Sequence, residues 1–237
     1  MNDWSSATLS RKSDMPDNLL IFDCDGVLVD SVPISLGLMI ERCKAHGVVL
    51  DLAMACECCL GKPVAVAARE VNRIHQTSVP DIDLEDFQRK VLRQFELSLK
   101  PVPGIAQALE KLKQPKCVAS SSAMKRIEKS VEITGLSDFF RENIFSTDMV
   151  RCGKPHPDIF LHAAREMGFT PSTALVIEDS PAGLQAAQAA NMKTIAYTGG
   201  SHAPYADLKT KLAAMSPDIL IEHMVDLPAA VDKLTAT

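Results

Sequence analysis

The feature that most constrains the fold of this chain is an alternation between short apolar runs and longer amphipathic segments. Leu19–Phe22 is a continuous apolar run that ends at Asp23, a pattern typical of a buried parallel strand. Similar runs follow at 116–120, 174–177, 194–196 and 219–221, and they are separated by amphipathic or alanine-rich segments at 105–112, 127–133, 159–167, 183–190 and 205–215. Strands alternating with helices predict a parallel sheet covered on both faces, in a doubly wound α/β fold.

The stretch 34–100 breaks this rhythm. Apolar residues recur there at spacings of three and four, and no strand pattern interrupts them, which favours a separate group of helices. The stripes are Leu36, Met39, Ile40 and Cys43; Val64, Ala67, Ala68 and Val71; and Phe87, Val91 and Phe95. Proline-containing linkers flank the stretch. We therefore predict a polar extension at 1–17, an α/β domain formed by 18–33 and 101–237, and an inserted all-helical domain at 34–100.

The overall charge gives no basis for binding an anionic polymer. Lysine and arginine total 25 and aspartate and glutamate total 30, a net charge of −5, so we expect neither nucleic acid nor a membrane as partner. No apolar run approaches the roughly 18 residues of a membrane span, and residues 1–17 lack the apolar centre of a signal peptide. An odd count of 7 cysteines favours reduced thiols. We expect a cytoplasmic protein, monomeric by default, with a dimer through the inserted helices as the alternative.

Two acidic pairs stand directly after apolar runs. Asp23 and Asp25 follow the first run, and Gly26 after them permits a turn that a side chain would obstruct. Glu178 and Asp179 follow a later run. Ligands in open α/β sheets bind beyond the carboxyl ends of the strands, so neighbouring strands would bring the two pairs together. Converging carboxylates suit Mg²⁺, whereas helix capping is the structural alternative for either pair alone.

Two further features at strand ends are suited to an anion. Ser120, Ser121 and Ser122 precede an expected helix, where hydroxyls and free backbone N–H groups form an anion site, although serine is also a common helix cap. Lys154 is followed by two prolines that restrict the backbone before the next helix. A lysine fixed there would neutralise a phosphate group and an aspartyl nucleophile, and an exposed surface lysine is the alternative.

In this order and at these strand ends, the four features resemble the motifs of the haloacid dehalogenase superfamily. Residues 22–31, FDCDGVLVDS, are similar to its first motif. Ser120, Lys154 and the pair Glu178-Asp179 stand where its second, third and fourth motifs are expected. The resemblance extends from Leu19 to the end of the chain. It is greatest for the phosphatase branch with an inserted helical cap of the C1 type, which includes sugar-phosphate and phosphoglycolate phosphatases and β-phosphoglucomutase, and it implies a Rossmann-like core.

The resemblance implies an enzyme that hydrolyses a small phosphorylated metabolite, such as a sugar phosphate or phosphoglycolate, with Mg²⁺ as cofactor. Asp23 would be the nucleophile that forms an aspartyl-phosphate, and Asp25 would protonate the leaving alcohol and then activate water. The metal would be held by Asp23, the carbonyl of Asp25 and Asp179, with Glu178 acting through a bound water.

The family also supplies roles for the anion-binding residues. Ser120 and the backbone N–H of Ser121 would bind the transferred phosphoryl oxygens, with Gly26 beside them. Lys154 would be the catalytic cation that offsets their charge. The inserted helices would act as a cap that closes over the substrate and selects the leaving group.

The same resemblance separates the competing activities. Family dehalogenases lack the second aspartate, so Asp25 argues against dehalogenation. β-Phosphoglucomutase has a cap histidine where this chain has Ser35 and a cap arginine where it has Val64, which favours hydrolysis over the mutase reaction. A phosphonatase with a cap lysine as Schiff base, Lys44 or Lys62, and a non-catalytic binding protein are the remaining alternatives.

Two features of the cap are open from the sequence. Lys62 lies between two expected helices, where the family places its specificity loop, and it would bind a second anionic group of the substrate or be a solvated loop lysine. Cys56, Cys58 and Cys59 form a C-x-C-C pattern without the paired spacing of zinc sites. We expect these cysteines to pack within a helix.

Overall fold

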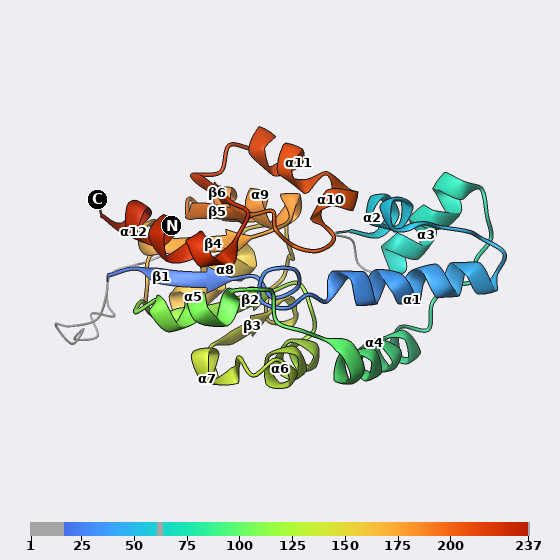
Figure 1. Ribbon diagram of the computed structural model, residues 1–237, viewed down its shortest axis with the longest axis horizontal. Helices are drawn as coiled ribbons and strands as arrows, with labels where there is room; N and C mark the ends of the chain where they lie inside the picture. Colours follow the sequence, from blue (N-terminus) through green and yellow to red (C-terminus); the bar gives the residue numbers. More distant parts are fainter. Residues whose placement is uncertain (1–16, 61–63, 237) are drawn as a thin grey trace.

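The structure is a computed structural model that describes residues 17–60 and 64–236 (Figure 1). Its centre is a sheet of six parallel strands in the order β3-β2-β1-β4-β5-β6. The strands are β1 (Leu19–Phe22), β2 (Lys116–Ser120), β3 (Ile144–Ser146), β4 (Ala174–Glu178), β5 (Lys193–Tyr197) and β6 (Ile219–Ile221). The order reverses direction at β1, and ligands of such sheets bind beside that reversal. The predicted doubly wound α/β fold is confirmed.

Burial of both sheet faces explains why the strands lack polar alternation. All four residues of β1 are buried. Leu20 and Phe22 pack into an apolar cluster on one face, and Leu19 and Ile21 pack into a second cluster on the other. A strand buried on both faces is stable only as a continuous apolar run, so its first polar residue marks its end.

Helices cover both faces of the sheet (Figure 1). On one face α8 (Asp158–Glu166) and α9 (Pro181–Ala189) join the cluster around Leu19. The other face is covered by α5 (Ile105–Lys111), α7 (Ser137–Phe140) and α12 (Leu227–Thr235). The remaining helices of the core are α6 (Met124–Ile133), α10 (Ala203–Ala206) and α11 (Leu208–Ala214), with short 3₁₀ turns η1 (Thr147–Met149), η2 (Pro171–Thr173) and η3 (Met224–Asp226).

In the described part of the insertion, four helices form the cap. They are α1 (Val32–Ala45), α2 (Leu52–Cys59), α3 (Val64–His75) and α4 (Leu84–Ser98), and Figure 1 shows them grouped beyond the arrowhead of β1. The apolar stripes predicted from the sequence face the inside, where Met39, Cys43, Val71, Val91 and Phe95 are buried. Asp51 and Asp83 cap α2 and α4 by accepting backbone N–H groups, which fixes where these helices begin.

The two linkers between core and cap run side by side. Val29 and Pro101 form an antiparallel bridge, and the Asp30 N–H donates to the Lys100 carbonyl at 2.9 Å. This pairing holds the entry and exit of the cap together directly after the first strand. The domain boundaries given above stay a prediction.

Some elements were not anticipated. The sequence patterns did not identify β3, α7 or α12, and the expectation of one continuous helix at 205–215 is wrong. Asp207 has a left-handed φ of 49° that separates α10 from α11. Lys62 lies outside the described residues. Within residues 17–60 and 64–236, no helix combines the length and apolarity needed to cross a bilayer.

Candidate active site

The candidate site lies at the carboxyl edge of the sheet, which we define as the ends of β1, β2 and β4. The parallel register pairs Phe22 with Ile177, and the Asp23 N–H continues the ladder by donating to the Ile177 carbonyl at 3.0 Å. Asp23 therefore leaves β1 beside the point where Glu178 ends β4. The sequence prediction that the second acidic pair lies beside Asp23 is confirmed by this register.

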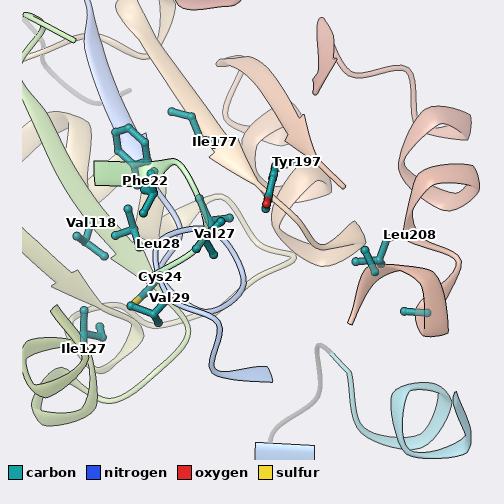
Figure 2. Packing of buried hydrophobic residues seen from close by; sticks show 14 of the residues in the cluster. Phe22, Cys24, Val27, Leu28, Val29, Val118, Ile127, Ile177, Tyr197 and Leu208 are labelled. Carbon is teal, nitrogen blue, oxygen red and sulfur yellow. The ribbon is translucent and has the colours of Figure 1, made fainter. Parts of the chain in front are cut away.

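A tight turn after β1 orients the first acidic pair. The Gly26 N–H donates to the Val29 carbonyl at 2.8 Å, and Gly26 has a φ of 90°, which strongly favours glycine. Cys24, Val27 and Leu28 are buried in the apolar cluster beside Phe22 (Figure 2). The loop is thus anchored by its apolar side chains, which leaves the carboxylates of the first pair at the carboxyl edge.

Lys154 joins two of the carboxylates. Its Nζ lies 2.6 Å from Asp23 Oδ1 and 2.6 Å from Glu178 Oε1, and its side chain is only 4% exposed. Nζ also lies 4.8 Å from the centroid of the Phe160 ring. Burial lowers the pKa of Lys154, but the negative charges of Asp23 and Glu178 outweigh that effect, so the net pKa is raised and the ammonium stays charged.

Three carboxylates form a cluster that fits a divalent cation. The acidic triad, Asp23, Glu178 and Asp179, has carboxylate oxygens within 4.8 Å of one another. Asp179 Oδ2 is buried without a hydrogen-bond partner among the described residues. A Cβ on Gly26 would lie 1.8 Å from that oxygen, so only glycine leaves the carboxylate accessible. Buried oxygen ligands of this kind suit a hard cation.

The buried negative charges of the triad also favour the binding of a cation. Burial raises the pKa of Asp23 well above its ordinary value; Glu178 and Asp179 raise it further, and Lys154 opposes them. Both Glu178 oxygens already have partners, since Oε1 accepts from Lys154 and Oε2 accepts from the Ser180 N–H at 2.8 Å. The residues therefore fit a divalent ion held mainly by the two aspartates of the triad, with Glu178 one layer further out.

Asp25 is held by three donors. Ser122 Oγ donates to its Oδ2 at 2.5 Å, Arg126 Nη2 donates to Oδ1 at 2.7 Å, and Ser31 Oγ also donates to Oδ1. Burial raises the pKa of Asp25, but the Arg126 charge and the hydroxyl donors outweigh it and lower the net pKa. The carboxylate form is stabilised in this arrangement.

Arg126 was not anticipated from the sequence. Its Nη2 also donates to Ser35 Oγ of α1 at 3.2 Å, and its guanidinium carbon lies 5.0 Å from the centroid of the Phe95 ring of α4. Arg126 thus connects the core helix α6 to the cap helices α1 and α4 and to Asp25. No local signal identifies this role, because Ser122 precedes the extended N-cap residue and lies outside the helix that carries Arg126.

Ser120 and Ser121 lie at the end of β2, and their anion-binding role stays a prediction. Ser120 ends β2 and is buried, and its Oγ accepts the Ser122 N–H at 3.2 Å. Ser121 is exposed, and its carbonyl accepts Thr147 Oγ1 at 3.1 Å. Among the described residues, the acidic triad is the one group of side chains able to hold a metal. Cys56, Cys58 and Cys59 are buried in α2.

Comparison with known proteins identifies the family. Residues 18–191 match the model of the haloacid dehalogenase-like hydrolases, and the chain belongs to this family. A solved structure of a conserved haloacid dehalogenase-like protein of unknown function from Agrobacterium tumefaciens has a TM-score of 0.80 and 31% identity, covering 92% of this chain and 98% of that chain.

Two curated relatives are named as phosphatases. The 6-phosphogluconate phosphatase of Escherichia coli (strain K12) is 26% identical over 184 residues, which covers 77% of this chain and 83% of the relative. The phosphorylated carbohydrates phosphatase of Thermotoga maritima is 29% identical over 188 residues, which covers 74% of this chain and 82% of the relative.

Proposed function

We propose that this protein is a Mg²⁺-dependent phosphatase that hydrolyses a small phosphorylated metabolite, with sugar phosphates as the first candidates, through an aspartyl-phosphate on Asp23. The observation that carries the proposal is the buried contact between Lys154 and Asp23, at 2.6 Å, beside an acidic triad in a hydrolase family. The names of the two curated relatives support phosphorylated carbohydrates as the substrate class.

In the first step Asp23 attacks phosphorus and the bond to the substrate oxygen breaks. Lys154 opposes the rise that burial causes in the pKa of Asp23, and its charge offsets the negative charge that develops on the phosphoryl group. Ser120 and the backbone N–H of Ser121 bind the phosphoryl oxygens as the group is transferred. A bound Mg²⁺, held by Asp23, Asp179 and the carbonyl of Asp25, supplies further neutralisation of the phosphoryl charge.

Asp25 serves as the acid and then the base. Its three donors favour the ionised form, which suits the second half of the reaction, when a water attacks the aspartyl-phosphate and gives a proton to Asp25. To protonate the leaving alcohol in the first half, Asp25 must first exchange the Arg126 and Ser122 contacts for a proton. Because Arg126 also contacts Ser35 and Phe95 of the cap, movement of the cap changes how strongly Arg126 holds Asp25.

The cap contact favours hydrolysis over the mutase reaction. Ser35, which stands where the related mutases have a cap histidine, accepts a hydrogen bond from Arg126. This position therefore carries a hydroxyl group that is already hydrogen-bonded to a core arginine. It has no imidazole that could transfer a proton to a second sugar hydroxyl.

The test is phosphate release from a panel of fructose 1-phosphate, glucose 6-phosphate, 6-phosphogluconate, phosphoglycolate and p-nitrophenyl phosphate, with Mg²⁺ or with EDTA. We expect release that requires Mg²⁺ and falls by about 10³-fold or more in Asp23→Asn. The ranking of the panel names the substrate class. Conversion of β-glucose 1-phosphate to glucose 6-phosphate without phosphate release would contradict the proposal and assign a mutase.

A further inference from the structure

A histidine that the sequence did not single out is buried against the acidic triad. His202, directly before α10, is 1% exposed, and its Nε2 lies 3.3 Å from Asp179 Oδ2. The contact is not aligned as a hydrogen bond, and Asp179 Oδ2 and His202 Nδ1 are both buried without hydrogen-bond partners among the described residues. Two polar groups in this state indicate an arrangement that becomes complete only when something else binds.

Two glycines from distant loops make room for this pair. A Cβ on Gly26 would lie 1.8 Å from Asp179 Oδ2 and 3.1 Å from His202 Cε1. A Cβ on Gly200 would lie 2.9 Å from His202 Cε1. Any side chain at either position would displace the imidazole or the carboxylate, so the backbone on both sides is fitted to the contact.

The loop that carries His202 is also anchored to the linker of the cap. Ser201 Oγ donates to Asp30 Oδ1 at 2.7 Å, and the Asp30 N–H donates to the Lys100 carbonyl. The Ala203 N–H donates to the Gly200 carbonyl at 2.9 Å. His202 is therefore held from both sides, which limits the rotamers that its imidazole can adopt.

We propose that His202 is a positioning residue for the metal ligand Asp179: its Nε2–H comes into line with Asp179 Oδ2 when the cation binds, and it then fixes the orientation of the carboxylate. The inference rests on the divalent-cation site of the proposed function. His202 does not belong to the acidic triad, so it acts through Asp179 and not as a ligand. The tautomer with the proton on Nε2 is favoured because that nitrogen faces a carboxylate oxygen, whereas no acceptor bonds to Nδ1. Partners of this kind orient the ligands of metal sites.

The test is Mn²⁺ binding to the purified protein without substrate, followed by electron paramagnetic resonance. His202→Leu should weaken Mn²⁺ binding by about 10- to 100-fold. His202→Gln should bind within a few-fold of the unmodified protein, because its amide N–H can reach the place of Nε2, whereas the shorter His202→Asn should bind as poorly as His202→Leu. His223→Ala, an exposed histidine at the same end of the molecule, is the control and should bind normally.

Two results would overturn the inference in distinguishable ways. If the unmodified protein binds Mn²⁺ and all three His202 variants, folded by circular dichroism, bind it equally well, the metal site stands and the role of His202 is wrong. If the unmodified protein binds no Mn²⁺, the metal site itself is wrong and the role of His202 falls with it. If His202→Leu does not fold, the difference in Mn²⁺ binding between His202→Gln and His202→Asn still tests the role of His202.

Discussion

At the carboxyl edge of the core, ion pairs join residues that are far apart in the sequence, whereas within the cap they join neighbours on one helix. Lys154 and Asp23 are 131 residues apart, and Arg126 and Asp25 are 101 apart. In the cap, Arg73 pairs with Glu70 and Lys90 pairs with Asp86, three and four residues away. Ion pairs between distant residues bring side chains together at the site, whereas ion pairs between residues three or four apart stabilise a single helix.

The ion pairs of the two regions also differ in burial. Lys154 and its partners in the core are almost completely buried, whereas the Arg73 side chain is 69% exposed and the Lys90 side chain 63% exposed. Exposed pairs contribute little to stability, while a buried charge that loses its partner is strongly destabilising. Charge-removing substitutions therefore separate the two regions, with a large effect at the carboxyl edge and a small one on the cap surface.

The largest effect is expected for Lys154→Met. The substitution leaves the acidic triad without its buried ammonium, so we expect kcat/KM for the best substrate to fall by about 10³-fold and the melting temperature to fall. Mg²⁺ should raise the melting temperature of this variant more than that of the unmodified protein, because the ion then supplies the missing positive charge. Calorimetry with and without Mg²⁺, beside steady-state kinetics, measures both.

Lys209→Met is the matched control for that experiment, since Lys209 pairs with Glu222 on the surface. It should leave kcat/KM unchanged. Lys154→Arg, which keeps the charge, tests the placement of the ammonium. Activity of Lys154→Met within 10-fold of the unmodified protein would show that the contact with Asp23 is not part of the catalytic machinery.

The residues on strand ends were predictable because the physics that places them is short in range. A strand buried on both faces ends at its first polar residue, and parallel strands end at the same edge, so Asp23, Ser120 and Glu178 had to meet. The glycine after the first acidic pair follows from the backbone geometry of the turn. The sequence therefore predicted which of these side chains lie at the carboxyl edge.

Arg126 and His202 were not predictable in this way. Arg126 belongs to an ordinary amphipathic helix, and its role depends on where α6 meets the cap helices. His202 lies in a loop whose path depends on the sheet, two glycines and Asp30. β3 has three residues, of which the last, Ser146, is polar, so its apolar run is shorter than that of β6, which is apolar throughout. Such features arise from tertiary contacts, which no local pattern encodes.

A smaller effect is expected for Arg126→Leu, which cuts the contact between the two regions. Arg126 lowers the pKa of Asp25, so its removal raises that pKa and the base form is lost at a higher pH. Since the base form acts in the hydrolysis of the aspartyl-phosphate, we expect the acid limb of the kcat profile to move to higher pH by about one unit. Lys125→Leu, an exposed neighbour on the same helix, should not move it. An unshifted limb in Arg126→Leu would show that Arg126 does not act on Asp25.

The most direct test of the central claim is to trap the phosphoryl group on Asp23. The enzyme is mixed with Mg²⁺ and the best substrate of the panel, quenched in acid within milliseconds, and treated with borohydride, which reduces an aspartyl-phosphate to homoserine. Peptide mass spectrometry should find homoserine at position 23, and Asp25 should be unmodified. Rapid phosphate release with Asp23 unmodified at every quench time would contradict the account, because the phosphoryl group would then pass to water without an enzyme-bound intermediate.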